Sequence, residues 1–200
     1  MSGSYQKATG KSNSARESRL QIERTGQVSP SEERNLAWDR PLTLKSSITV
    51  TPNENTPVLG MDLSGFRLFV FGRYKSGRRY TPYEKRGVDD NDRPRYESVR
   101  DEPLAEIGAN WFRTDLKLSK DFDLDNAQLT LSLEVKNLFN NRNAQIVNPV
   151  TGEGYRRGDP LPYSTRNPEY NYPQNTGLPP TNPARWTEPR HVLYGISFQF

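Results

Sequence analysis

The C-terminal stretch RHVLYGISFQF, Arg190–Phe200, decides the fold, because its apolar side chains recur at every second position. One parity is apolar: Val192, Tyr194, Ile196, Phe198 and Phe200. The other parity is polar or small, with Leu193 as its one exception: His191, Gly195, Ser197 and Gln199. Successive side chains of a β-strand point to opposite faces, so this period of two predicts a strand with one apolar and one polar face.

Earlier segments alternate in the same way, and each is close to the length of about 9–11 residues that a tilted strand needs to cross a bilayer. These segments are Leu36–Val50, Phe66–Tyr74, Asn110–Ser119 and Ala127–Phe139. A sixth strand is expected in Gly3–Gly10. The polar parities carry charges of both signs, which suits a wet interior: Arg67, Arg73, Arg113, Asp115, Lys117, Glu134 and Lys136.

The connections between these segments alternate between long and short. The long ones are Thr9–Asn35, Lys75–Ala105 and Asn140–Pro189, and the shorter ones are Thr51–Gly65 and Lys120–Asn126. Long extracellular loops and short periplasmic turns are typical of outer-membrane barrels. The pattern therefore predicts an all-β, antiparallel, up-and-down transmembrane β-barrel. A sheet in lipid has to close, and bacterial barrels begin at about 8 strands, so these are expected to be the last five or six strands of a larger barrel.

The composition agrees with this interpretation and excludes several others. Only 32% of the residues are hydrophobic and the mean hydropathy is -0.92, but a barrel averages lipid-facing with lumen-facing residues. The chain has no cysteine, so it has no disulfide framework and no thiolate chemistry. A net charge of +4 spread along the chain does not indicate a nucleic-acid partner. The N-terminus lacks the apolar core of a signal peptide, so a signal is expected upstream, outside this chain.

Motifs for catalysis or metal binding fail on inspection. ATGKS lacks the first glycine of a P-loop, since Tyr5 stands in its place. DFDLDN has Asn126 and Ser132 where a calcium loop needs glycine and glutamate. His191 is the only histidine, which leaves no zinc set and no histidine-based triad. We therefore expect no enzyme activity, no catalytic residue, no metal site and no cofactor.

Four phrases of the chain resemble the C-terminal barrel of TonB-dependent outer-membrane receptors, of the type with a carboxypeptidase-regulatory-like domain, also called Oar-like. These phrases are YKSGRRYTPY (74–83), RTDLKLSKDFDL (113–124), LEVKNLFNNRNAQIVNPVTGEGY (133–155) and NPARWTEPRHVLYGISFQF (182–200). The resemblance implies that residues 1–200 form the last part of a barrel of about 22 strands. The plug and other N-terminal domains would lie outside this chain.

The resemblance also implies a location and a function. The chain would sit in the outer membrane of a Gram-negative cell, contact lipid and the barrel assembly machinery, and serve TonB-energised uptake. The nutrient ligand would be large and scarce, either a metal chelate or an oligosaccharide, and TonB would act through the missing N-terminal part. Two alternatives stay open: a structural or adhesive outer-membrane barrel, and a soluble carbohydrate-binding β-sandwich.

Two sets of residues are predicted to carry this function. Arginine and tyrosine are favoured interface residues, so the loop candidates for ligand binding are Arg78, Arg79, Tyr80, Tyr83, Arg156, Arg157, Tyr170 and Tyr172. The lipid-facing side of the last strand comprises Val192, Tyr194, Ile196, Phe198 and Phe200. The resemblance makes the terminal Phe200 an assembly signal. Trp38 and Trp111 are expected near the outer strand ends, where aromatic girdles lie, but Trp111 shares the polar parity, and its alternative place is the lumen side.

Overall fold

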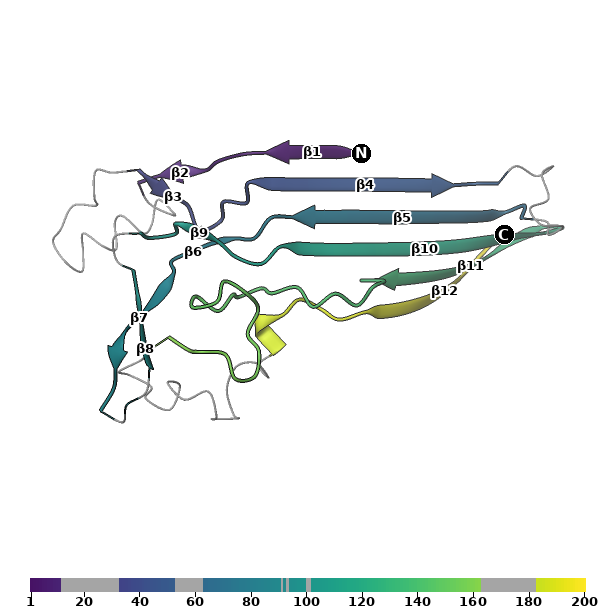
Figure 1. Ribbon diagram of the computed structural model, residues 1–200. Coiled ribbons are helices and arrows are strands. Elements are labelled where there is room, and N and C mark those ends of the chain that lie inside the picture. Colours follow the sequence, from purple (N-terminus) through teal and green to yellow (C-terminus); the bar gives the residue numbers. More distant parts are fainter. Residues whose placement is uncertain (12–32, 53–62, 91, 93, 100–101, 163–182) are drawn as a thin grey trace, which may run out of the picture.

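The computed structural model describes residues 1–11, 33–52, 63–90, 92, 94–99, 102–162 and 183–200. In these residues the protein is all-β, apart from one 3-10 turn, η2 (Pro183–Arg185), and its sheets are antiparallel. Strands in the main sheet are neighbours in the order in which they follow along the chain (Figure 1). They are β1 (Ser2–Tyr5), β4 (Leu42–Val50), β5 (Phe66–Lys75), β10 (Trp111–Leu124), β11 (Ala127–Lys136) and β12 (His191–Gln199).

The registers place most apolar residues of these strands on one face of the sheet, whereas Phe69, Phe71, Trp111 and Leu193 lie on the other. Leu129, Leu131 and Leu133 pair with Phe198, Ile196 and Tyr194. The same row continues across the sheet. Leu133 of β11 pairs with Leu118 of β10, and Leu118 pairs with Leu68 of β5. Leu68 in turn pairs with Val50 of β4. A one-residue slip would turn each row to the other face, so the alternation fixes the register. We call this surface the apolar face.

The opposite surface, which we call the polar face, carries the charged residues predicted to face a wet interior. Arg67 binds Asp121 at 2.6 Å and Arg113 binds Asp115 at 2.6 Å. Lys136 lies 3.6 Å from Glu134. Several of the predicted charges therefore pair along and across these strands, whereas Arg73 and Lys117 form no ion pair with a described residue.

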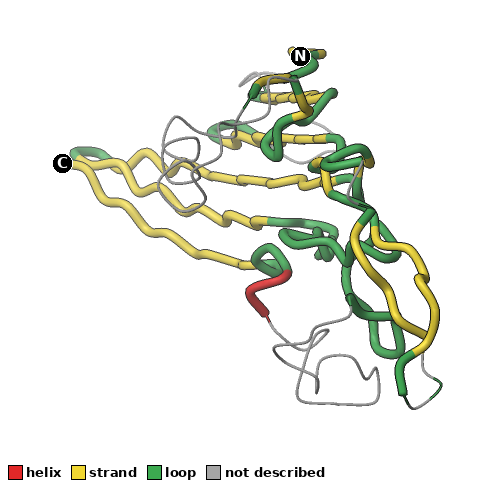
Figure 2. The backbone as a smooth tube through the Cα atoms, turned by 90° about the vertical axis from the view of Figure 1, so that its left-hand side faces the viewer, coloured by secondary structure: helices red, strands yellow, loops and turns green. Residues whose placement is uncertain are grey.

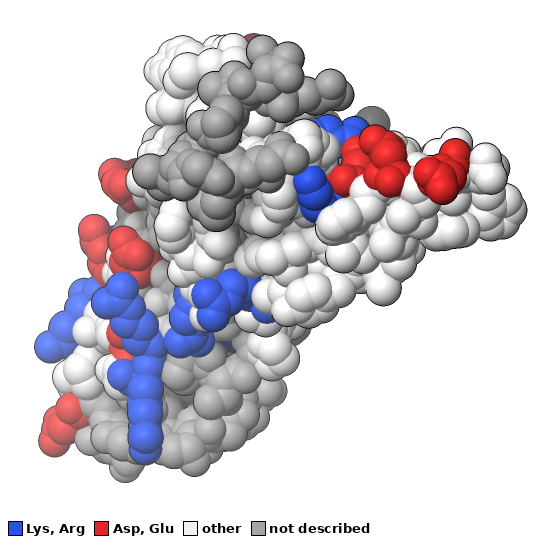
Figure 3. Space-filling model, turned by 90° about the vertical axis from the view of Figure 1, so that its right-hand side faces the viewer, with Lys and Arg blue, Asp and Glu red and all other residues white. Residues whose placement is uncertain are grey.

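The apolar face is largely uncovered by the described residues. Among the described residues, only Leu36 and Tyr155 are buried apolar side chains, and neither lies in the main sheet. On the apolar face, Tyr194 is 82% exposed, Ile196 78% and Ile48 59%. Figure 3 shows acidic side chains gathered toward the protruding tip, beside a broad surface without charge. The described residues thus form a single layer with no hydrophobic core of its own.

The described parts of the long connections lie at one end of the sheet (Figure 1). That end also holds three small ladders: β2 (Thr9–Gly10) with β3 (Arg34–Asn35), β6 (Arg79–Tyr80) with β9 (Glu106–Ile107), and β7 (Tyr83–Val88) with β8 (Pro94–Ser98). Figure 2 shows the main strands stacked in one twisted layer, with the β7–β8 hairpin projecting away from it. The opposite end has a turn of only Asp125 and Asn126 between β10 and β11.

Several predicted boundaries were wrong. The first long strand begins at Leu42 rather than Leu36, so Leu36 and Trp38 precede it. Pro41, which has no N–H to donate, stands directly before β4. The strand predicted to end at Ser119 runs on to Leu124, because Asp121 and Asp123 continue the polar parity instead of forming a turn.

Two further corrections concern the loop-rich end. The strand predicted over Ala127–Phe139 ends at Lys136, because Asn137 adopts a positive φ of 55° that bends the chain. The connection Lys75–Ala105, predicted to be a loop, contains β6, β7 and β8. No helix in the described part of the chain is long and apolar enough to cross a bilayer.

Candidate functional site

The connection from β11 to β12 folds into a cap at the loop-rich end, and three buried asparagines hold it. Asn137 donates through Nδ2 to the carbonyls of Asn141 at 3.1 Å and Glu188 at 3.2 Å. Its Oδ1 accepts the Asn141 N–H at 2.9 Å. Asparagine tolerates the positive φ found here and offers both donor and acceptor, so one side chain ties the start of the cap to its end.

The other two asparagines fasten the cap to the sheet and to itself. The side-chain amide of Asn143 pairs with the backbone of Phe112 in β10, as the backbone of a neighbouring strand would. Its Oδ1 accepts the N–H of Phe112 at 2.9 Å and its Nδ2 donates to the Phe112 carbonyl at 2.8 Å. Asn148 is fully buried, donates to the Pro160 carbonyl at 2.8 Å and accepts the Val150 N–H at 3.0 Å. Their polar groups are therefore satisfied without water.

Trp186 forms the inner wall of the cap. It makes an antiparallel bridge with Ala144, and a Cβ added at Gly154 would lie 2.4 Å from its ring, so the two chain segments touch there. The Arg142 guanidinium lies 4.7 Å from the centre of the Trp186 ring. Next to it, the Arg185 guanidinium lies 3.7 Å from the centre of the buried Tyr155 ring. Cation–π contacts of this kind stabilise by about 0.5–1 kcal/mol at exposed sites.

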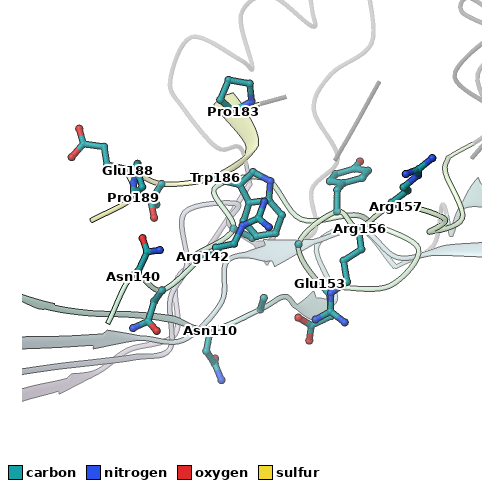
Figure 4. Close-up of a pocket in the computed structure, with 16 residues that line it drawn as sticks. Asn110, Asn140, Arg142, Glu153, Arg156, Arg157, Pro183, Trp186, Glu188 and Pro189 are labelled. Atoms are coloured by element: carbon teal, nitrogen blue, oxygen red, sulfur yellow. The ribbon is translucent and has the colours of Figure 1, made fainter. Parts of the chain in front are cut away.

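A large open cavity of about 1340 Å³ lies between the cap and the start of β10. Its charged lining residues are Arg142, Glu153, Arg156, Arg157 and Glu188. Figure 4 shows Asn140 and Glu188 on one side, Arg156 and Arg157 on the other, and Trp186 with Arg142 between them. The cavity exceeds the 300–1,000 Å³ or so of a typical drug-sized pocket, so it has room for a ligand larger than a drug-sized molecule. We call it the cap cavity.

Tyr80 supports the cap from β6. A Cβ added at Gly152 would lie 2.6 Å from the Tyr80 hydroxyl oxygen, so a larger residue here would force the Tyr80 side chain to move. Gly152 also has a positive φ of 73°, which disfavours any other residue. Burial raises the pKa of the Tyr80 hydroxyl, and the nearby carboxylates of Glu106 and Glu153 raise it further.

The predicted loop candidates do not form one site. Arg156 and Arg157 line the cap cavity, whereas Arg78, Arg79, Tyr80 and Tyr83 lie in or beside the β6 and β7 strands. Arg79 is bound to the fully buried Asp39 at 2.9 Å and to the Ala105 carbonyl at 2.9 Å, so its guanidinium is occupied by the fold. Tyr170 and Tyr172 lie outside the described residues.

Sequence reasoning missed Arg142, Glu153, Trp186 and Glu188 as cavity residues. Arg142 stands in the polar run NNRN, which looks like an ordinary turn. The available signal was the single tryptophan of this long connection, which also carries several arginines. Their contact depends on the fold of that connection, which periodicity does not describe.

The predicted lipid-facing residues do share one face of β12. Val192, Tyr194, Ile196 and Phe198 pair with the apolar residues of β11, and Phe200 follows the strand with 95% of its surface exposed. Trp111 begins β10 on the polar face, next to Arg73 and Lys75, rather than on the apolar face. Trp38 lies before β4 and is 55% exposed.

Within the described residues, no three histidine, cysteine or acidic side chains come together as a set that could hold a metal ion. The cap cavity offers guanidinium, carboxylate and amide groups and one indole wall, which together can recognise a polar ligand by hydrogen bonds and charge. No protein-family model, curated protein sequence or solved structure matches the chain.

Proposed function

We propose that this chain is a section of the wall of a TonB-dependent outer-membrane receptor for a large scarce nutrient. The observation that carries the proposal is the sheet itself: one largely apolar face, one charged face, and the described parts of the long connections at one end. An apolar face of this extent has to be covered by something, and lipid is the partner that the alternation of a barrel strand serves.

The strand lengths support the same proposal. The five long strands from β4 to β12 run for 9 to 14 residues, whereas β1 is short. About 9–11 residues span a bilayer when the strand is tilted. Among the described residues, the edges of the main sheet are β1 and β12. In lipid, these edges would need further strands, which a larger barrel supplies.

The same observations favour a barrel over a soluble β-sandwich. A sandwich buries its apolar face against a second sheet about 10 Å away. In the described residues the apolar face is exposed, and the small ladders gather at the loop-rich end instead.

In this proposal the cap cavity belongs to the extracellular side and captures the nutrient, either a metal chelate or an oligosaccharide. TonB acts through the N-terminal part of the receptor, and no bond of the nutrient is broken. Phe200 and the apolar residues of β12 serve as the signal for the barrel assembly machinery. Growth on the nutrient that depends on TonB separates uptake from a structural or adhesive barrel.

Cysteine labelling tests the membrane part of the proposal. The chain has no cysteine, so single substitutions give a clean signal. We expect Leu131→Cys and Leu133→Cys, on the apolar face, to resist a membrane-impermeant maleimide in intact outer membranes. Thr130→Cys and Ser132→Cys, on the polar face of the same strand, are the matched controls and should react. Equal labelling of both pairs, or recovery of the protein in the aqueous fraction, would refute it.

A further inference from the structure

A cluster of cationic side chains lies on the polar face where β4 and β5 reach the loop-rich end. The register pairs Lys45 with Arg73, and Arg73 in turn with Arg113. Of these, Arg113 is neutralised by Asp115 at 2.6 Å. Like charges directly opposite each other destabilise a sheet, so this row costs free energy as it stands. Lys75 lies one row further toward the loops, opposite Thr43 on one side and Trp111 on the other.

Two arginines from the adjoining loops extend the cluster. Arg40 donates to the carbonyl of Ser76 at 2.9 Å, which places it beside the end of β5. Burial lowers the pKa of the Arg40 guanidinium, and the nearby Arg78 guanidinium lowers it further. We name Arg40, Lys45, Arg73, Lys75 and Arg78 the cationic cluster.

The cationic cluster has no counter-charge in the described part of the chain. None of its members forms an ion pair with a described aspartate or glutamate, whereas Arg67, Arg79 and Arg113 all do. The Nε of Arg73 is buried and has no hydrogen-bond acceptor among the described residues. A buried donor without an acceptor costs about 1–3 kcal/mol, so an acceptor brought by a ligand would be favourable there.

An aromatic surface lies beside these charges. The Trp111 ring is 5.5 Å from the Arg73 guanidinium and 5.5 Å from the Lys75 amine, and Arg73 also lies 5.2 Å from the Phe71 ring. The rings hold the cations in place without neutralising them. Positive charge held in position and lacking its partner is the arrangement by which proteins recognise phosphate and carboxylate groups.

We propose that the cationic cluster, together with Trp111, binds a small multivalent oxyanion that carries several phosphate or carboxylate groups. Several negative groups are required because a single one would leave most of the repulsion among the five cations in place. Binding does not depend on the membrane. A role of this site in uptake, as a second binding site on the inner wall of the barrel below the cap cavity, rests on the proposed receptor function.

The test is a titration of the full chain in non-ionic detergent micelles at low ionic strength, with tripolyphosphate and citrate as separate probes. Trp111 lies in the site, so its fluorescence is expected to change on saturation, and calorimetry gives the affinity. Exposed charges are screened by salt, so the affinity should fall as salt is added. Tighter binding of tripolyphosphate or of citrate decides between phosphate and carboxylate ligands.

The variants separate this site from general electrostatic attraction. Arg73→Gln combined with Lys75→Gln should weaken binding at least tenfold, while Arg67→Gln, at the far end of the same strand and face, should leave it unchanged. Arg73→Lys combined with Lys75→Arg keeps both charges and should retain binding, which also covers the case in which the neutral double variant does not fold.

Three outcomes would overturn the proposal: no saturable binding of either probe, equal loss in Arg67→Gln, or tight binding of a polyglutamate peptide with none of the small anions. The last outcome would assign the cluster to an acidic protein segment. Saturable binding in a chain whose apolar face is fully labelled by maleimide would keep this site and refute the receptor proposal instead.

Discussion

The main sheet and the loop-rich end bury opposite kinds of residue. In the six main strands every described side chain except Thr114 is at least partly exposed, including all the leucines and phenylalanines. At the loop-rich end the buried side chains are mostly polar, and Asp39, Asn137 and Asn148 are the most completely buried of all. The main sheet thus leaves its apolar face exposed, whereas the loop-rich end buries polar side chains.

This difference indicates where the free energy of each region comes from. Hydrogen bonds and one buried ion pair hold the loop-rich end together. Both partners of each of these interactions belong to this chain. The sheet has complete ladders but leaves its apolar area exposed, so its packing energy has to come from its surroundings. Removing apolar area from water yields about 25 cal/mol per Å², which makes the sheet more dependent on its environment than the end is.

The largest effect is expected from opening the buried ion pair. Asp39→Ala leaves Arg79, whose side chain is only 12% exposed, without its carboxylate and should cost about 3–5 kcal/mol of unfolding free energy. The matched pair is Arg67 with Asp121 on the sheet, where Arg67→Ala should cost about 0–1 kcal/mol because Arg67 is 54% exposed. Urea titration in detergent micelles measures both. Equal costs would contradict the contrast.

A charge placed on each face of one strand probes the surroundings of the sheet. Ile48→Arg on the apolar face should cost about 2–4 kcal/mol in a bilayer, whereas Ser47→Arg on the polar face should cost less than about 0.5 kcal/mol. Both positions are exposed in the described residues, so a protein in water should tolerate both. Folding yield into vesicles, compared between the two variants, checks this. Similar yields would show that no lipid covers Ile48.

Alanine substitutions at two glycines compare how tightly the cap and the main sheet are packed. A Cβ at Gly154 would lie 2.4 Å from the Trp186 ring, so Gly154→Ala should destabilise the cap by about 1–3 kcal/mol. At Gly72 in β5 the nearest atom is 4.0 Å away, so Gly72→Ala should be close to neutral. Hydrogen exchange around Asn143 reports on the cap, and faster exchange is expected only in Gly154→Ala. Unchanged exchange would mean that the Trp186 contact does not hold the cap.

The smallest effect concerns Tyr80 and alkaline pH. Its pKa is raised in the folded state, so the folded protein holds this proton more tightly than the unfolded chain does. The stabilisation is present in full below the unfolded pKa of about 10 and is lost as pH rises through the folded value. Tyr80→Phe should therefore remove part of the fall in stability above about pH 10. Thermal unfolding at alkaline pH, with Tyr83→Phe as the control, measures the difference.

The sequence predicted the sheet because its evidence is local. Alternation along Gln128–Lys136 assigns each side chain to a face, and the terminal strand repeats the pattern in register. The extension of β10 was missed because Lys120 interrupts the apolar parity. Its amine lies near the Phe66 and Phe122 rings and donates to the Ser64 carbonyl, so a lysine occupies an apolar row without ending the strand.

The cap and its cavity could not be predicted in the same way, because their contacts join residues far apart in the sequence. The bond from Asn137 to Glu188 spans the whole connection, and asparagines in such a run are typical of ordinary turns. The pairing of Asp39 with Arg79 crosses two strands. The cationic cluster likewise depends on the register of β4 against β5, which the lone strands do not reveal.

The turn of Asp125 and Asn126 gives this chain an order in which to fold. It joins β10 and β11 over two residues, while β11 and β12 are separated by residues 137–190 and β5 and β10 by residues 76–110. The entropy of closing a loop grows with its length, by roughly 0.6 kcal/mol for each doubling. We therefore expect the β10–β11 hairpin to form first and to act as the template onto which β5 and then β12 are added. The tip that carries Asp121, Asp123 and Asp125 would therefore be the first part of each molecule to reach its native structure.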